Sequence, residues 1–345
     1  MSATRGPKGL TIRPFDGSDA DYEATAAIWT ANWPDEPSSQ EGTRYADATR
    51  EKKYFFQRWM VELDGEIVAT AIASEPEWCY GPGKYDIQVR VLPEFQKRGI
   101  GGTLYAYVMD RLNELEHKPA NLHADAREDQ PHSVKFLTDR GFEQKQRQQV
   151  SRLDVASFDA APFAGSIKRF EESGLTMKTL EELEAEDPEG RRKAYEKYVE
   201  LFQDVPIFED RIEISYEMFE RELGAPNRIP GAITLVFDGD EIVGTTSLWK
   251  RLADPGNLGT GLTAVARSHR RRGIATALKV GAIEFARSLG TRVIQTDNEE
   301  NNPMYDLNVR LGFRPVPAWL IFQKLQGEMA EAAGSDAGVA AEETS

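Results

Sequence analysis

The chain has 345 residues, of which 40% are hydrophobic and 29% are charged, and its formal net charge at pH 7 is -15. This composition is typical of a soluble globular protein with two or three domains. The acidic excess argues against a general nucleic-acid binder, and no apolar run approaches the ~20 residues that cross a bilayer. Cys79 is the only cysteine, which excludes disulfides within the chain. We therefore expect a cytoplasmic monomer or homodimer with no nucleic-acid and no membrane partner.

In chain order, the first half contains an opening strand near 11–15, a helix that includes residues 21–33, and a strand hairpin near 63–70. Asp64-Gly65 supplies the turn chemistry of that hairpin. A long strand then ends at Val91, and a helix begins at Ile100 with apolar residues at helical spacing on one face. A further strand, a helix and the pair Gly141-Phe142 complete the half, where glycine can end a helix in the left-handed conformation.

The second half repeats this order. We expect its opening strand at 166–170, helices at 191–202 and 216–223, a hairpin at 238–245 and a closing pair Gly312-Phe313. A period near 170 residues indicates two homologous domains, at 1–160 and 161–326, followed by an acidic tail at 327–345 whose composition is typical of disorder. Helices that alternate with strands and hairpins predict an α/β fold (an α+β mixed sheet), with a mixed central sheet flanked by helices in each domain.

A basic turn rich in small residues lies between the long strand and the amphipathic helix in both halves. It reads Gln96-Lys-Arg-Gly99-Ile-Gly101 in the first and Arg270-Arg-Arg-Gly273-Ile-Ala275 in the second. A helix N-terminus carries unpaired N–H groups and a positive dipole, and glycine lets a pyrophosphate approach the backbone. One copy could be an ordinary tight turn, but the repetition favours phosphate binding. The expected binding residues are Val91, Gln96, Arg98, Gly99, Gly101 and Gly102 in the first copy, and Val265, Arg270, Arg271, Arg272, Gly273, Ile274, Ala275 and Thr276 in the second.

These turns resemble the acetyl-CoA pyrophosphate loop of the GNAT acetyltransferase superfamily. The two Gly-Phe pairs and the asparagine-containing segment 297–304 also match its motif order, so the resemblance covers almost the whole chain up to Gln326, in two copies. The resemblance implies a tandem N-acetyltransferase that uses acetyl-CoA as co-substrate and needs no metal. It would transfer the acyl group to the amine of a small molecule by direct attack in a ternary complex.

The resemblance also bears on catalytic residues. The tyrosine that often protonates the leaving thiolate in this family is Leu137 in the first half and Asn308 in the second. Asn308 could still hydrogen-bond the cofactor, and Tyr305, one helical turn earlier, could replace the tyrosine or be an ordinary surface residue. Asp204 is the candidate to anchor or deprotonate the amine, although an aspartate that ends a helix is the alternative.

Arg270 at the head of its loop and polar residues such as Asn301 favour the second half as the one that binds acetyl-CoA. The first half would then bind a second molecule or serve as a scaffold. The missing tyrosines favour a competing hypothesis, in which the protein is a noncatalytic CoA-binding regulatory or scaffold protein.

Overall fold

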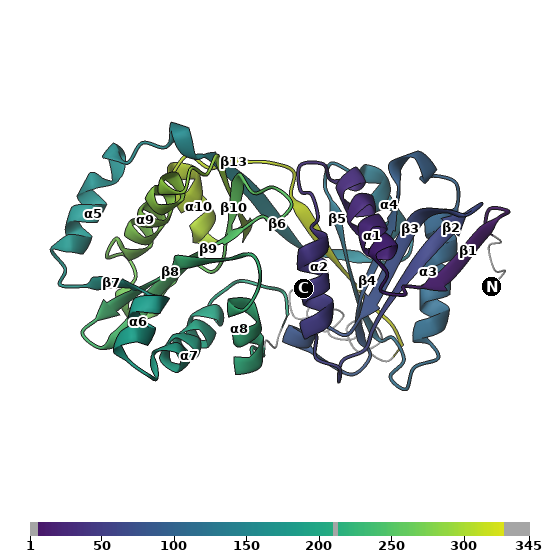
Figure 1. The fold of residues 1–345 in the computed structure, drawn as a ribbon, viewed down its shortest axis with the longest axis horizontal. Coiled ribbons are helices and arrows are strands. Elements are labelled where there is room, and N and C mark those ends of the chain that lie inside the picture. The colour runs from purple at the N-terminus through teal and green to yellow at the C-terminus, as the bar shows by residue number, and fades with distance from the viewer. Residues whose placement is uncertain (1–5, 210–212, 328–345) are drawn as a thin grey trace, which may run out of the picture. The chain divides into compact units, whose positions relative to one another are not determined.

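The computed structural model describes residues 6–209 and 213–327, which form two compact units (Figure 1). The first unit comprises the chain up to Gln146 together with the segment from Trp319 onward, and the second is Arg147–Ala318. The division expected from the repeat lay at residue 160, so the contacts divide the chain earlier than the sequence pattern does. The acidic tail lies outside the described residues from position 328.

The first unit has a six-stranded mixed sheet. In sheet order its strands are β1 (Leu10–Pro14), β2 (Phe56–Leu63), β3 (Glu66–Ser74), β4 (Lys84–Val91), β5 (Asn121–Arg127) and β14 (Trp319–Leu325). Neighbours pair antiparallel except β4 and β5, which are parallel. Asp64 and Gly65 form the hairpin turn between β2 and β3, as predicted, and both have positive φ.

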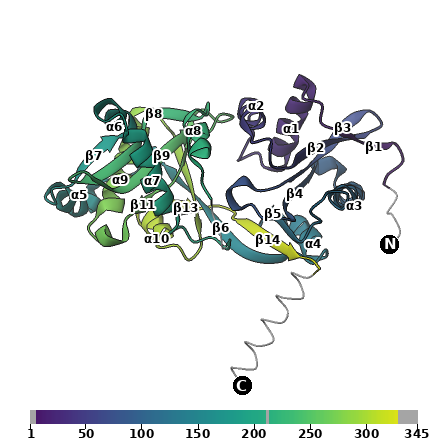
Figure 2. The same cartoon turned by 90° about the horizontal axis from the view of Figure 1, so that it is seen from below.

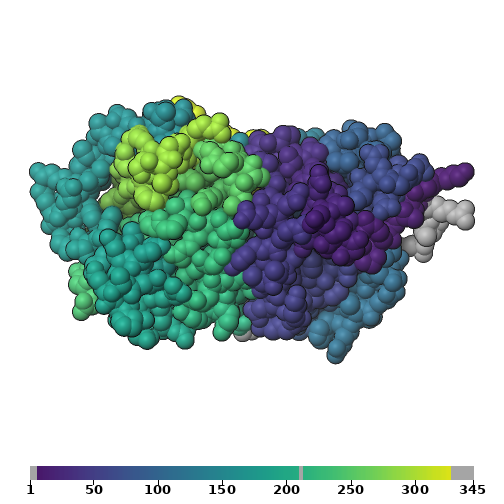
Figure 3. Space-filling view, in the orientation of Figure 1, coloured from purple at the N-terminus to yellow at the C-terminus, as the bar shows by residue number. Residues whose placement is uncertain are grey.

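Helices cover both faces of this sheet (Figure 2). Helices α1 (Asp19–Asn32) and α2 (Gln40–Thr49) lie on one side, and their part of the chain forms much of the purple surface in Figure 3. Helices α3 (Ile100–Leu112) and α4 (Pro131–Thr138) lie on the other. The predicted apolar face of α3 is buried in the core: Ile100, Leu104, Val108 and Leu112 are at most 1% exposed.

Strands β4 and β5 separate along their length. They pair only from Lys84 to Asp86 on β4 and from Asn121 to His123 on β5, although both strands continue further. Beyond Asp86, β4 pairs with β3 along one edge only. The opening exposes backbone N–H and C=O groups of β4 to a ligand, because the usual strand neighbour has moved away.

The second unit repeats this plan. In sheet order its strands are β6 (Glu143–Asp154), β12 (Val293–Glu299), β10 (Asn257–Thr260), β9 (Glu241–Lys250), β8 (Arg228–Asp238) and β7 (Thr176–Thr179), with β11 (Ala264–Val265) on β9 and β13 (Arg314–Pro315) on β6. Its helices are α5 (Ala164–Glu171), α6 (Leu180–Glu186), α7 (Gly190–Phe202), α8 (Tyr216–Leu223), α9 (Ile274–Ser288) and α10 (Pro303–Arg310). The helices expected at 191–202 and 216–223 are confirmed as α7 and α8.

Each half gives its last strand to the sheet of the other unit. Most of β6, which ends the first half in sequence, pairs with β12, so that Ile294 lies opposite Leu153. The strand β14, which ends the second half, pairs with β5, so that Ile321 lies opposite Asp125. This exchange explains why the contact-defined units differ from the domains expected at 1–160 and 161–326.

One predicted element is wrong. Residues 166–170 were expected to open the second sheet, but they lie within the helix α5. Ile167 and Phe170 are three residues apart, which is helical spacing, and both pack against apolar clusters of the second unit. Gly174, with φ of 74°, follows the helix. The strand that pairs like β1 is β7, so the counterpart of Leu10-Thr11 is Leu175-Thr176. Within the described residues, none of the helices combines the length and the apolarity that crossing a bilayer demands.

Candidate functional site

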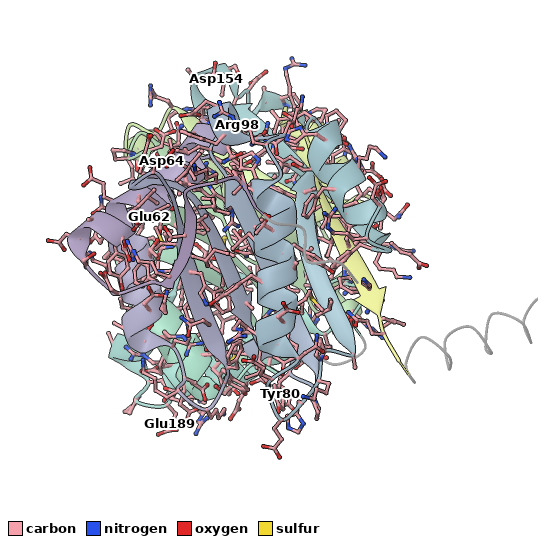
Figure 4. All side chains as sticks on the ribbon, turned by 90° about the vertical axis from the view of Figure 1, so that its right-hand side faces the viewer. Glu62, Asp64, Tyr80, Arg98, Asp154 and Glu189 are labelled. Atoms are coloured by element: carbon pink, nitrogen blue, oxygen red, sulfur yellow. The ribbon has the colours of Figure 1, made fainter. Side chains whose placement is uncertain are left out.

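The first glycine turn is open and built for an anion. Gly99 precedes α3 with φ of 83°, and a Cβ placed on it would meet nothing within 4 Å. The Gln96 side chain does not point its amide at a ligand but donates to the Val91 carbonyl at 3.0 Å, which holds the turn against the end of β4. Figure 4 shows Arg98 at the end of the unit where α3 begins, opposite the end that carries Tyr80. The free N–H groups of the first turn of α3 therefore face open space.

A cavity of about 770 Å³ extends from this turn into the opening between β4 and β5. All of its lining residues belong to the first unit. The sequence-predicted residues that line it are Val91, Gln96, Arg98, Gly99, Gly101 and Gly102. The volume is within the usual range for sites that hold a small molecule or cofactor.

Arg140 adds a cation that the sequence analysis did not assign. Its guanidinium lies against Gly102, where a built Cβ would be 3.4 Å from Nη2, and it stacks on the Phe136 ring at 3.5 Å from the ring centroid. Partial burial removes water from the guanidinium of Arg140 and so lowers its pKa. A cation that is poorly solvated gains more from a phosphate partner. Its counterpart next to the second Gly-Phe pair is Leu311, and that difference was visible in the sequence.

Tyr105 also lines the cavity and was missed. It is partly buried on α3 beside Phe136 and Phe142, and its hydroxyl makes no hydrogen bond within the described part of the chain. Burial raises the pKa of Tyr105, with Arg140 opposing, so the phenol stays protonated at neutral pH. The position four residues before Gly141, where a tyrosine was sought, is Leu137, and it lines the same cavity.

Charged residues on β4 and β5 form the other wall. The carboxylate of Asp86 pairs with His123 at 3.4 Å, and Arg127 pairs with Asp35 at 2.7 Å. Two further residues of these strands, Arg90 and Asp125, line the cavity itself. The two strands that separate therefore supply two charged side chains to the cavity.

The second glycine turn has the same backbone and is covered. Gly273 has φ of 85°, and Arg270 donates to the Val265 carbonyl at 3.1 Å as Gln96 does to Val91. However, a Cβ on Gly273 would lie 3.2 Å from the carbonyl oxygen of Ser166 on α5. A carbonyl oxygen this close to the turn repels a phosphate that approaches Gly273 from that side.

Asp204 further neutralises the second turn. Its carboxylate accepts hydrogen bonds from Arg267, at 2.9 Å to Nε, and from the Arg270 side chain. Its hydrogen bond with Arg267 is the largest cause that lowers the pKa of Asp204, and the charge of Arg270 adds to it. A carboxylate held as an anion by two arginines is a weak base, so this geometry does not support the expected role of Asp204 in deprotonating an amine.

The remaining candidates of the second half are distributed over separate environments. Asn308 is fully buried on α10 and donates to Asn298 at 2.7 Å, so it does not face a ligand channel. Asn301 is exposed and donates to Glu299 at 2.8 Å. Tyr305, on the same helix, has its backbone N–H bound to Asn302 at 2.8 Å. The structure does not join these residues with Asp204 into one cluster. Arg271, Arg272, Ile274, Ala275 and Thr276 follow the covered turn or flank it.

A lysine stands in the second unit where Tyr105 stands in the first. Lys279, 174 positions later on α9, is 2% exposed, and it interacts electrostatically with the exposed Asp297 of β12. Asp297 follows the same strand pattern as Asp125 of the first unit. Burial lowers the pKa of Lys279 to about 8, with Asp297 opposing. A buried lysine therefore stands in the second unit where the first has a phenol.

A family model connects both halves to known proteins. The model of the acetyltransferase (GNAT) family matches residues 22–142 and again residues 192–313. The two matches together cover more than half of the chain, one in each half. The chain therefore belongs to the GNAT family, with two GNAT domains in tandem. A comparison with curated proteins finds no match in sequence.

Solved structures show the same fold. A tandem GNAT protein from the clavulanic acid biosynthesis pathway is similar over 92% of this chain and 99% of its own, with a TM-score of 0.70 and 19% identity. A GCN5-related N-acetyltransferase from Sphaerobacter thermophilus is similar over 93% and 97%, with a TM-score of 0.66 and 18% identity. The N-myristoyltransferase of Saccharomyces cerevisiae, solved with bound myristoyl-CoA, is similar over 93% and 79%, with a TM-score of 0.57 and 11% identity.

The family uses acyl-CoA, and the first unit fits such a group. Its open turn at Gly99, the cation of Arg140 and the adjoining cavity provide backbone donors, charge and room together. Among the described residues no group of three or more His, Cys, Asp and Glu side chains is arranged to hold a metal ion.

Proposed function

We propose that the protein is an acetyl-CoA-dependent N-acetyltransferase that acts on the amine of a small molecule, and that its working site lies in the first unit. The observation that carries the assignment to this unit is the contrast between the two glycine turns. At Gly99 the space is open and continues into a cavity, whereas at Gly273 the carbonyl of Ser166 lies close against the turn. This assignment replaces the expectation that the second half binds acetyl-CoA.

The residues of the first unit have separable tasks in this proposal. The N–H groups that follow Gly99 and the guanidinium of Arg140 would hold the pyrophosphate. When bound, acetyl-CoA supplies a thioester whose acyl carbon accepts the amine. Open N–H groups of β4 beyond Asp86 would donate to the acyl oxygen, where negative charge develops. Tyr105 would give a proton to the departing sulfur, the task of the tyrosine that Leu137 replaces.

The second unit then acts as a scaffold. It keeps the backbone of a GNAT domain, but α5 and Asp204 cover its turn, and Lys279 is buried inside it. After the second unit, the chain returns to the first unit and forms β14, which pairs with β5. We infer one acetyl-CoA site per chain.

Release of the CoA thiol over a panel of primary amines tests this proposal, with the N-acetyl product detected by mass spectrometry. We expect product and thiol in equal amounts with at least one amine. The competing hypothesis, a noncatalytic CoA-binding protein, expects tight binding of acetyl-CoA by calorimetry and no thiol release above the rate of hydrolysis with any acceptor.

A further inference from the structure

Arg90 and Asp125 carry opposite charges into the cavity without forming a direct ion pair. Arg90 is 8% exposed, and its charge acts on the half-buried Asp125 across the opening between β4 and β5. By contrast, Asp86 and Arg127 on the same two strands each have a direct polar partner, His123 at 3.4 Å and Asp35 at 2.7 Å. A buried cation and a half-buried carboxylate that stay apart in one cavity leave space for a ligand that has both charges.

Arg90 is held in place and still has hydrogen-bonding capacity. Its Nη1 donates to Gln88 at 2.6 Å, and its guanidinium lies over the Trp29 ring at 4.3 Å from the centroid. Its Nε is buried and makes no hydrogen bond within the described part of the chain. An unpaired buried donor on a cation costs free energy unless a ligand satisfies it, and a carboxylate matches the guanidinium best.

Asp125 lies on the side of the cavity formed by β5. Burial raises the pKa of Asp125, while Arg90 opposes the shift and Asp86 adds to it. A carboxylate with a raised pKa holds a proton more readily at neutral pH, as a base for an ammonium group must. Its neighbour across the strand pair, Ile321, is apolar, so Asp125 is the acidic group at this point of the wall.

We propose that the acceptor is a small zwitterion, an amino acid, whose carboxylate binds Arg90 and whose ammonium group binds Asp125. This inference rests on the proposed function, and it narrows the acceptor from any amine to one that also carries a carboxylate. The site has one positive and one negative side chain, and a zwitterion supplies the opposite charge to each of them. A simple amine would pair with Asp125 alone and leave the buried Arg90 without an anion.

The transfer balances with these two residues. The ammonium group of the acceptor loses one proton to Asp125, which passes it to solvent, and the nitrogen lone pair then forms the bond to the acyl carbon. The carbon–sulfur bond breaks with its electron pair on sulfur. The nitrogen loses a second proton, and the sulfur takes up one, so the products are an N-acetyl amino acid, the CoA thiol and one proton.

The test compares each of the twenty standard amino acids with its primary amide, which keeps the side chain and the amine but lacks the carboxylate. We expect kcat/KM for the best acid to exceed that of its amide by roughly tenfold or more, as loss of one charge-assisted contact implies. Arg90→Met should abolish this preference, mainly through a higher KM for the acid. Asp125→Asn should lower kcat/KM for acid and amide alike. Arg111→Met, which removes an exposed arginine of α3 outside the cavity, should change neither.

Equal use of acid and amide, or a preference that survives Arg90→Met, would overturn this inference and leave the proposed acetyltransfer standing. If no acceptor releases thiol, the proposed function fails, and calorimetry with the CoA-saturated protein decides the inference alone. Binding of a free amino acid, but not of its amide, in an Arg90-dependent manner supports a zwitterion site. Binding of neither, or of both alike, overturns it.

Discussion

The carbonyl oxygen of Ser166 lies 3.2 Å from the point where a Cβ on Gly273 would stand. The equivalent point at Gly99 has no atom within 4 Å. Both glycines have the same left-handed conformation, with φ of 83° and 85°, so the backbones of the two turns are alike and only their surroundings differ. One turn is available to a phosphate, and the other is covered by the helix α5.

This difference predicts opposite results for a matched pair of variants. Gly99→Glu places bulk and negative charge at the open turn, so acetyl-CoA binding should weaken by roughly a hundredfold or more. Gly273→Glu should leave binding unchanged and lower the melting temperature, because the side chain meets Ser166. Both variants place a side chain at positive φ, which costs about 1–2 kcal/mol in each. This strain is common to the pair and therefore does not account for a difference in binding. Titration calorimetry measures the binding, and loss in Gly273→Glu alone would return the site to the second unit.

Tyr105→Phe tests the proton donor. The phenylalanine keeps the ring contacts with Phe136 and Phe142 and removes only the hydroxyl. We expect kcat to fall by roughly tenfold to a hundredfold while the affinity for acetyl-CoA stays within about twofold, as removal of a general acid implies. Rates in single turnover and calorimetric binding separate the two quantities. The matched control is Tyr107→Phe on the same helix, which does not line the cavity, and an equal fall in that variant would argue against a specific role for Tyr105.

Asp204→Asn separates structure from catalysis in the second unit. The pair with Arg267 and Arg270 is largely exposed, so its loss should reduce the free energy of unfolding by no more than about 1 kcal/mol. Because the folded pKa of Asp204 is lowered, its contribution is complete above the unfolded pKa of about 3.9 and is lost as pH falls through the folded value. Denaturant unfolding should show a smaller difference between the two proteins at pH 3 than at pH 7. A fall of kcat/KM by a hundredfold would restore Asp204 as a catalytic residue.

The buried Lys279 predicts a rise of stability with pH. Its folded pKa is lowered to about 8 from the ordinary lysine value of 10.5, so between these values the unfolded chain binds the proton more tightly. Stability should therefore increase from pH 8 upward, by on the order of 1 kcal/mol per pH unit at most. The double variant Lys279→Met with Asp297→Asn removes both charges and should lack this increase. Melting temperatures of both proteins from pH 7 to 9.5 provide the comparison, and parallel profiles would show that the lysine is not desolvated.

Much of the fold follows from local patterns in the sequence. The hairpin at Asp64-Gly65, the apolar face that begins at Ile100 and the helix ends at Gly141 and Gly312 depend on turn chemistry and periodicity within a few residues. The strand at 166–170 was expected because a short apolar-basic alternation resembled the true opening strand. Its helical packing depends on contacts with α9, which lie more than a hundred residues away in sequence.

The candidate site was less accessible to sequence reasoning. The glycine turns could be located, but which turn is open depends on Ser166 and Asp204, whose contacts are tertiary. The richer basic run at Arg270 suggested the better anion site, whereas in the fold two of its guanidinium groups are satisfied by internal carboxylates. The second half has leucine where the first has Arg140, and lysine where the first has Tyr105. A comparison of the two repeats position by position would have found both differences in the sequence.

Because β14 pairs with β5, the sheet beside the site can be completed only after the second unit has been synthesised. As the chain leaves the ribosome, β5 and Asp125 appear early, but Ile321 and the rest of their strand neighbour are synthesised only after the whole second unit. At about 5–20 residues per second this interval lasts on the order of ten seconds or more. During it the edge of β5 lacks the partner it has in the folded protein, so a nascent first unit has an open strand edge that a chaperone or another chain can bind. The proposed active site is thus encoded first and completed last.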